Sequence, residues 1–420
     1  VVQYAIQGML PQCVVSPATT AELAAVMKAC HQAGVHVVPW GGGTQQAIGP
    51  LLDRPEVIIV TRRLNQVLRY DPDDLTIGVE AGMSLAELKV VLATHHQHFP
   101  VAVADQEHTT LGGLVATATN GPRCWGYGSW RDLVLGLTVV QGDGTVIRLG
   151  GQVVKNVSGY DLVKLFTGSY GTLGVITEVR LRTFPCPPAT ITLAAGFLDL
   201  QDVSYFLAAL AATRLRPVAV EVCDAAAQDR QQFAGTLVVL AQFDGHPAAC
   251  ERSAVESASL ATAHRARTLW LARGSEQDQL WQPVLRVATI PSEPTIWPIR
   301  VAVDPDQFAA VFADLRQSAA QHGVTATIAG RPYQGLVYGH LQGNIDQVGR
   351  MLTDLVTRWP HTQLPAGPLP LSHEQWRWGR STTLFNEELS AWLKDAFDPA
   401  HRLNRRRWPF GMRAVNPYSE

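Results

Sequence analysis

The chain has 420 residues, with 34 Lys and Arg against 36 Asp and Glu, which gives a formal net charge of −2. The balance leaves no electrostatic footprint for a nucleic acid, apart from the short basic run Arg405–Arg407, and the length predicts two domains or one domain with an insertion. The six cysteines are scattered, without a C-x-x-C pair for zinc or an iron–sulfur cluster, so a reducing, cytoplasmic compartment is expected. No segment reaches the about 20 uninterrupted apolar residues of a membrane span, so any membrane attachment is expected to come through a partner.

The first 60 residues predict a β-α-β-β unit with glycines at the end of a strand. Short β-branched strands are predicted at residues 13–15, 35–38 and 57–60. Thr19 and Glu22 form a capping box for a helix that runs to about Gly34. The second strand leads directly into PWGGGT at residues 39–44, where consecutive glycines free backbone N–H groups to converge on an anion such as a pyrophosphate. A plain turn is the alternative.

A second capping box, Ser84 with Glu87, predicts a helix that extends through His98. The cluster of His95, His96 and His98 suggests a metal site. A role without metal is favoured. Histidines are stabilised in the last turn of a helix by the helix dipole, and residues adjacent in sequence point in different directions.

Strands and small residues follow up to residue 150. A strand is predicted at 75–79 and a hairpin at 133–149 around Gly142-Asp143-Gly144. Between them, small residues and hydroxyls alternate over 109–117, and 120–132 adds glycines and aromatic rings. This composition suits a polar, planar ligand that lies against the backbone.

The stretch 155–178 carries four glycines, so it is predicted to be a loop that feeds a short strand at 174–179. After the stiff segment 185–188, two β-α-β passes are predicted, with strands at 191–197, 218–222, 236–243, 299–303 and 325–328, and helices at 203–213 and 307–322. They predict a smaller antiparallel sheet with helices on one face. A Pro- and Trp-rich segment, 367–378, leads to a final helix at 387–397.

Three motifs in order resemble one family: PWGGGT, TTLGGLVATATNGPRCWGYGSWRDLVLG and GGQVVKNVSGYDLVKLFTGSYGTLGVITEV. Together they resemble the FAD-binding domain of the vanillyl-alcohol oxidase (PCMH-type) flavoproteins, most closely the FAD-binding subunits of glycolate oxidase/glycolate dehydrogenase. The resemblance is dense over residues 13–188 and thin beyond. It implies an α+β fold with a two-subdomain PCMH-type FAD-binding domain at 1–188, a smaller ferredoxin-like α+β cap at 189–366 on the substrate side, and a C-terminal segment, 367–420, that returns to the FAD domain.

The resemblance also implies roles for single residues. N–H groups of the turn would hold the flavin pyrophosphate: Gly41, Gly42, Gly43, Thr44 and Gln45. The phosphate and isoalloxazine side would be lined by Thr110, Leu111, Gly112, Gly113 and Ala116. The adenosine half would meet the backbone of Gly174, Val175 and Ile176. A Val at position 42 is expected to close the anion cradle while leaving the fold mostly intact.

Three departures from the family pattern matter. Trp40 stands where the resemblance leads one to expect Arg, so the turn has one charge fewer. Thr44 replaces the His to which some members attach FAD covalently, so the resemblance implies non-covalent FAD, with Cys124 the residue to check for another link. The run Gly339–Asp346 lacks the second histidine and the acid of the catalytic relatives, so no metal site is expected and His340 is the one candidate base.

The resemblance implies an FAD-dependent oxidoreductase: the FAD-binding subunit of a glycolate (2-hydroxyacid) oxidase or dehydrogenase complex, which oxidises glycolate to glyoxylate. The expected partners are a second flavoprotein subunit and an iron–sulfur subunit. The alternatives are a self-sufficient 2-hydroxyacid dehydrogenase and a flavin-free scaffold, while Tyr127 and Arg131 either touch substrate or fix their loop. A P-loop is disfavoured because the chain has no Gly-Lys dipeptide, and hydrolysis because Gly168-Ser169-Tyr170-Gly171 misses the G-x-S-x-G pattern and precedes a strand.

Overall fold

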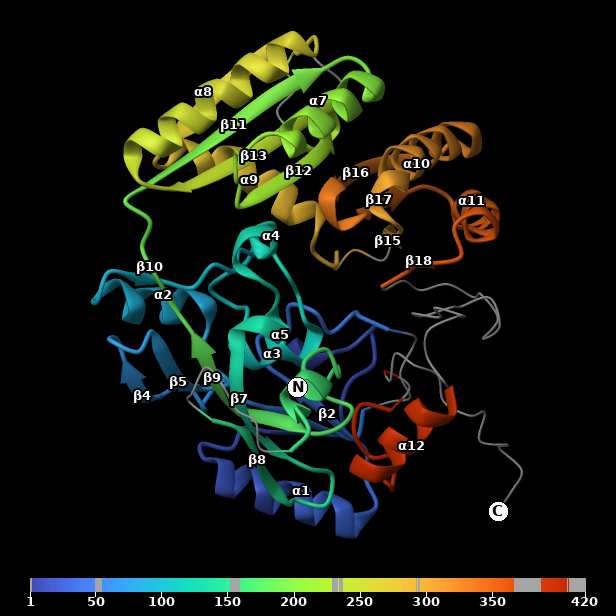
Figure 1. The fold of residues 1–420 in the computed structure, drawn as a ribbon. Helices are drawn as coiled ribbons and strands as arrows, with labels where there is room; N and C mark the ends of the chain where they lie inside the picture. Colours follow the sequence, from blue (N-terminus) through green and yellow to red (C-terminus); the bar gives the residue numbers. More distant parts are fainter. Residues whose placement is uncertain are drawn as a thin grey trace.

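The computed structural model describes residues 2–49, 55–151, 159–228, 233, 237–291, 293, 295–365, 387–405 and 407. The part of the predicted loop at 155–158 and the Pro- and Trp-rich segment at 367–378 lie outside these residues. Two sheet-containing bodies stand one above the other in Figure 1, joined by the chain between β10 and β11. Within the described residues, no helix combines the length and the apolar composition needed to cross a membrane.

A small parallel sheet begins the fold. Its strand order is β1 (Cys13–Val15), β3 (Val57–Val60) and β2 (Val37–Trp40). Helix α1 (Thr20–Ala33) packs on this sheet through Leu23 and Met27, with Thr19 capping its start and Gly34 ending it at φ 71°. The predicted β-α-β-β unit is confirmed, with β2 starting two residues later than expected.

The second sheet is antiparallel and has five strands among the described residues. Their order is β4 (Val67–Asp71), β5 (Thr76–Glu80), β9 (Val175–Arg182), β7 (Val134–Val140) and β8 (Val146–Gly150). Short helices cover it or bridge to it: α2 (Leu85–Ala93), α3 (Leu111–Thr117), α4 (Cys124–Tyr127), α5 (Trp130–Leu133) and α6 (Leu162–Phe166). A shared core of Leu, Val, Phe and Trp side chains, with Trp130 fully buried, holds the sheet to the helices.

Two predictions for this part were wrong. The helix predicted to run through His98 ends at Ala93, and His98 belongs instead to β6 (Gln97–His98), which pairs with β10 (Phe184–Pro185). The stretch after residue 158 was predicted to be a loop before its strand, but it contains helix α6. Its apolar residues Val163 and Phe166 are buried against the sheet, which outweighs the glycines that flank them.

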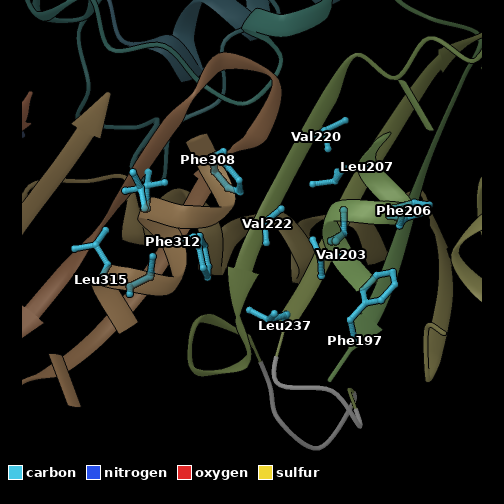
Figure 2. Close-up of a cluster of buried hydrophobic side chains, with 14 of the residues drawn as sticks. Phe197, Val203, Phe206, Leu207, Val220, Val222, Leu237, Phe308, Phe312 and Leu315 are labelled. Carbon is cyan, nitrogen blue, oxygen red and sulfur yellow. The ribbon is translucent and has the colours of Figure 1, made fainter. Parts of the chain in front are cut away.

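The second body is built on an antiparallel sheet of eight described strands. Their order is β14 (Thr268–Arg273), β11 (Ala189–Phe197), β13 (Leu237–Gly245), β12 (Ala219–Asp224), β16 (Thr325–Arg331), β17 (Leu336–Gln342), β15 (Ile296–Ala302) and β18 (Thr362–Gln363). One face carries α7 (Leu200–Ala212), α8 (Pro247–Ala263), α10 (Phe308–His322) and α11 (Ile345–Arg358). Figure 2 shows the core on this face, where Val203 of α7 and Phe312 of α10 lie on either side of Val222 of β12.

The prediction of helices on one face alone was wrong. Helix α9 (Glu276–Val287) packs on the opposite face, where Leu280, Trp281 and Val284 meet Cys223 and Ala329 of the sheet. The described single-turn helices are η1 (Val2–Tyr4), η2 (Ala225–Ala227), η3 (Pro305–Gln307) and η4 (Pro332–Gln334).

The last described helix, α12 (Glu387–Phe397), lies beside the first body in Figure 1, and its predicted bounds are confirmed. The rings of Phe397 and Phe166 pack edge to face, with their centroids 5.3 Å apart. Lys394 Nζ donates to the carbonyl oxygen of Thr172 at 2.5 Å, and Leu403 forms a parallel bridge with Val37. Residues 387–405 therefore contact the first body at β2, at α6 and at the loop before β9.

Candidate functional site

A first cavity lies where the turn after β2, helix α3 and the start of β9 converge. Twelve of the thirteen residues that the resemblance assigns to FAD line it: Gly41, Gly42, Gly43, Thr44, Gln45, Thr110, Gly112, Gly113, Ala116, Gly174, Val175 and Ile176. The exception is Leu111, which is fully buried in the core of the five-stranded sheet. Three motifs far apart in the chain thus meet around one space.

The glycine turn is held tightly against the protein itself. Gly43 has φ +79°, a left-handed conformation that favours glycine. A Cβ on Gly42 would overlap with the carbonyl oxygen of His108, and a Cβ on Gly41 would overlap with Thr110 Oγ1. The expectation that a Val at position 42 would fill the cradle and spare the fold was therefore wrong, because the side chain would strike backbone instead.

Helix α3 presents its first turn to the first cavity. Thr110 caps the helix, since its Oγ1 accepts a hydrogen bond from Gly113 N at 3.3 Å. Gly112 packs against Ala81, the residue that follows β5, because its N–H donates to the carbonyl oxygen of Ala81 at 2.7 Å and an added Cβ would lie 2.8 Å from the Ala81 Cβ. The small residues and hydroxyls that alternate over 109–117 thus form a capped helix, and the small residues allow it to pack closely on its neighbours.

Sequence reasoning expected the C-terminal segment to return to the FAD domain but assigned none of its residues to the cofactor site. Asn404 and Arg407 also line the first cavity, and Arg407 is only 3% exposed. The Arg407 guanidinium donates to Gln46 Oε1 at 2.8 Å and to the carbonyl oxygen of Gln46, while its Nε has no hydrogen-bond partner among the described residues. Burial lowers the pKa of Arg407 to about 9. The sequence signal for this contribution was the basic run Arg405–Arg407 in a chain whose charges are otherwise balanced.

The chemistry of this lining fits a dinucleotide flavin. Glycine backbone and the hydroxyls of Thr44 and Thr110 offer donors for phosphate oxygens, and Arg407 offers a buried cation. Trp40 packs edge to face on Tyr4, with centroids 5.2 Å apart, and occupies the space beneath Gly43. It therefore shapes the turn without supplying charge.

A second cavity, of about 340 Å³, lies between the two bodies. Thr44, Gln45 and Thr109 line both cavities, so the two spaces share a wall. The cap contributes Arg300 and Arg331 among other residues. A molecule in the second cavity would therefore lie against the same residues that line the first.

The two arginines of the second cavity differ in their partners. Arg331 already has partners within the protein. Its Nε lies 2.8 Å from Glu221 Oε1, and its Nη2 donates to the carbonyl oxygen of Asn120 at 2.9 Å. Arg300 forms no hydrogen bond or ion pair with any described residue. Burial is the main influence on Arg300 and lowers its pKa, while the neighbouring Tyr170 opposes that effect. Arg300 is thus the guanidinium available to an anion in this cavity.

His340, the candidate base, lies beside the second cavity and is not part of its lining. Its Nε2 is 2.9 Å from the carbonyl oxygen of Thr289, a lining residue, and burial lowers the pKa of the imidazole. The described residues contain no group of three or more His, Cys, Asp or Glu arranged to hold a metal ion. His98 instead packs on the ring of Tyr127, with centroids 5.3 Å apart.

Tyr127 and Cys124 connect the first body to the cap. The Tyr127 hydroxyl donates to Asp244 Oδ2 at 2.7 Å, and Tyr127 lines neither cavity. Cys124 Sγ is 3.2 Å from Gln334 Nε2 and lines neither cavity either. Of the two uses considered for Tyr127, the structure places it where it fixes its loop to β13. Arg131 is exposed on α5.

Two family models match this chain. Residues 11–150 match the FAD binding domain model, and residues 186–343 match the model of the C-terminal domain of FAD linked oxidases. The chain is 20% identical to an alkyldihydroxyacetonephosphate synthase of known structure, with a TM-score of 0.71 over 94% of this chain and 76% of that one. At this identity the likeness concerns the fold.

Curated relatives match over parts of the chain. It is 31% identical to glycolate oxidase subunit GlcD of Bacillus subtilis (51% of this chain, 46% of the relative) and 32% identical to a D-lactate dehydrogenase of Anaerostipes hadrus (56% and 50%). It is 37% identical to glycolate oxidase subunit GlcE of Escherichia coli (37% and 43%). The matches span about half the length of these relatives. With an FAD-binding domain followed by an FAD-linked oxidase C-terminal domain, the chain belongs to the PCMH-type FAD-linked oxidases, a family of FAD-dependent oxidoreductases.

Proposed function

We propose that this chain is the FAD-binding subunit of a 2-hydroxyacid dehydrogenase complex that oxidises glycolate to glyoxylate. The observation that carries the proposal is Arg300, a half-buried guanidinium that lines the second cavity and has no hydrogen-bond or ion-pair partner among the described residues. A 2-hydroxy acid brings the carboxylate that such a group binds with two parallel hydrogen bonds.

The shared wall of the two cavities gives the proposal its geometry. Thr44, Gln45 and Thr109 separate the cap arginine from the glycine turn, so an acid bound by Arg300 would lie against the FAD-binding residues. FAD, when bound, accepts the two electrons that leave the substrate. The chain's own residues hold the carboxylate, orient the α-carbon and exclude water between the two bodies.

The second cavity has no base suited to neutral pH among its described lining residues. The Tyr338 hydroxyl donates to Glu221 Oε2 at 3.0 Å, and burial raises the pKa of Tyr338 well above its ordinary value. Asp105 lies 3.0 Å from His108 Nδ1 and is engaged there. A positioned general base accelerates a reaction roughly 10²–10⁴-fold. The lack of one among these residues supports a chain that works together with partner subunits. The proposed partners are a second flavoprotein subunit and an iron–sulfur subunit, in line with relatives whose names describe subunits.

The second candidate is a self-sufficient 2-hydroxyacid dehydrogenase. It is favoured by the match to a D-lactate dehydrogenase and by His340, one hydrogen bond away from the cavity wall at Thr289. For this candidate, His340 would have to turn from the Thr289 carbonyl oxygen toward the substrate to accept the hydroxyl proton.

Anaerobic bleaching of the flavin separates the two candidates. Glycolate and D-lactate should bleach the lone chain slowly and the reconstituted complex rapidly, whereas rapid bleaching of the lone chain that His340→Ala abolishes would establish the second candidate. Arg300→Met should weaken substrate affinity by roughly 10- to 100-fold, because it removes charge-assisted hydrogen bonds. Arg214→Met, at an exposed cap arginine, is the matched control. Unchanged substrate affinity in Arg300→Met would contradict the site.

A further inference from the structure

We infer that Arg407 is the cationic contact for the pyrophosphate of FAD and supplies, from the C-terminal segment, the charge that Trp40 does not. The inference rests on FAD as the cofactor and is independent of the 2-hydroxy acid. Arg407 is the one charged residue among the described residues that line the first cavity. A cavity with a single buried positive charge favours an anion.

Burying the charged Arg407 side chain costs free energy unless an anion lies beside it. The side chain is almost fully buried, and its described hydrogen bonds go to neutral oxygens of Gln46. These bonds leave Nε without a partner. Buried guanidinium groups are ordinarily paired with a carboxylate or a phosphate, and no carboxylate lies among the described lining residues. The unmet requirement is therefore a negative charge at the first cavity.

The position of Arg407 identifies which part of the cofactor meets it. Gln46, which holds the guanidinium, directly follows the glycine turn, and its own Nε2 donates to the carbonyl oxygen of Pro39 at 3.0 Å. The turn and the arginine are thus fixed to each other through one side chain. Because the backbone donors of the turn suit phosphate oxygens, the pyrophosphate is the anion that both would share.

The C-terminal segment is fixed firmly enough to aim this arginine. Asp398 accepts hydrogen bonds from Arg402 N at 3.1 Å and Leu403 N at 2.9 Å. Asn404 N donates to the carbonyl oxygen of Val37 at 2.9 Å, and Arg407 N donates to that of Asn404 at 3.0 Å. Leu403 and Asn404 therefore lie beside β2, and Arg407 reaches the cavity three residues after Asn404.

The test is cofactor affinity of the full chain after the flavin has been removed. FAD is titrated by fluorescence quenching, ADP is tested as a competitor that carries only the pyrophosphate side, and riboflavin is tested as a ligand that carries only the ring side. Arg407→Gln should weaken FAD and ADP binding about 10- to 100-fold and leave riboflavin binding unchanged, and Arg407→Lys should lose less. Arg405→Gln, at an exposed neighbour, should bind all three as the unmodified chain does.

The outcomes are separable. Equal FAD and ADP affinity in Arg407→Gln and the unmodified chain would overturn the inference, as would an equal loss for riboflavin, which would place the arginine at the ring. If Arg407→Gln does not fold, Arg407→Lys decides: near-normal FAD affinity with retained salt sensitivity supports a cationic role, and loss of FAD from a folded Lys variant opposes it. Failure of the unmodified chain to bind FAD would instead refute the cofactor assignment.

Discussion

Arg331 and Glu221 form an ion pair that the cap buries almost completely, with 7% and 0% of their side chains exposed. Arg331 Nε lies 2.8 Å from Glu221 Oε1, and the Tyr338 hydroxyl donates a second hydrogen bond to Glu221 Oε2. Arg331→Met should lower the free energy of unfolding by about 3–5 kcal/mol, because it leaves the Glu221 carboxylate buried without a counter-charge.

Urea unfolding measures this effect. Combining Arg331→Met with Glu221→Gln removes the stranded charge, so the double variant should recover part of the lost stability. A single variant that loses less than about 1 kcal/mol would mean that water reaches Glu221 and solvates it.

His98 should make the stability of the chain depend on pH. Burial above all, with the nearby charge of Arg123, lowers the pKa of His98 from 6.5 to about 4, while Asp244 opposes the effect and Lys89 adds to it. Between these two pH values the unfolded chain binds a proton that the folded chain does not, so stability is lost as pH falls from 6.5 toward 4. For this half-buried ring the loss should be roughly 2 kcal/mol.

The measurement is urea unfolding of the unmodified chain and His98→Gln at several values between pH 4 and 7.5. Carboxylates add their own acid dependence to both proteins, so the difference between the two curves reports His98 alone. The Gln variant should show the flatter curve. Parallel curves would show that His98 is solvated in the folded protein.

At the residue scale, the sequence predicted best where backbone chemistry decides. The glycines of PWGGGT could be recognised because few other residues tolerate such a turn, and Gly43 has the left-handed φ that this requires. Arg300 and Arg407 could not be recognised in that way. Their importance comes from what surrounds them after folding: 340 Å³ of space between two bodies for one, and burial beside Gln46 for the other.

At the element scale, Lys394 and Asp398 anchor helix α12 to the first body. Their side chains are 2% and 1% exposed and 2.5 Å apart, and Lys394 also donates to the carbonyl oxygens of Thr172 and Leu403. Lys394→Met should destabilise the chain by about 3–5 kcal/mol, because it strands the buried Asp398 carboxylate. It should also speed proteolysis near residue 400. The FAD content should fall as well, because helix α12 positions the segment that carries Arg407.

Asp395→Asn is the control on the same helix. It breaks only the exposed contact with His401 at 2.8 Å, so its effect should stay below about 1 kcal/mol. Protease digestion, scored by the masses of the fragments, and the ratio of flavin to protein absorbance give the two readouts. Equal digestion rates for Lys394→Met and the unmodified chain would refute the anchoring role.

Sequence periodicity identified elements with large apolar residues better than those with small ones. The predicted helices at 203–213 and 307–322 correspond to α7 and α10, whose phenylalanines fill the core in Figure 2. Helix α8 was missed because its buried face consists of Cys250, Ala254, Ser257 and Ala261, which show little contrast in hydrophobicity with their neighbours. Helix α11 was not predicted from the sequence. Its first residues, from Ile345, belong to the run 339–346, which had been interpreted as the remnant of a catalytic motif.

At the scale of the whole molecule, all the flavin should leave the protein when it is denatured. Thr44 cannot form a histidyl link, and Cys124 lines neither cavity, because its Sγ faces Gln334 and Arg331. Acid precipitation should therefore leave a colourless pellet and a supernatant whose flavin runs as FAD rather than FMN on chromatography. A yellow pellet would contradict this, and Cys124→Ser would then be the first variant to examine.

The joining of the two bodies was beyond sequence reasoning. The halves of the cap sheet join where β12 pairs with β16, through Val222 with Gly330 and Cys223 with Ala329. On the other side of the domain boundary, Arg123 of the first body donates to Gln242 at 3.1 Å. Neither strand pattern nor composition specifies such pairings, because partners more than 100 residues apart meet only after each unit has folded.

The bridge between Val37 and Leu403 has a consequence for the time at which the cofactor can enter. A ribosome makes β2 more than 300 residues before it makes Leu403, so the growing chain carries its glycine turn for most of its synthesis without the neighbour that completes the wall. Domains generally fold as they emerge, at roughly 5–20 residues per second. Flavin loading would then be a late event, after residues 387–407 have left the exit tunnel, and nascent chains stalled before that point should carry no yellow colour.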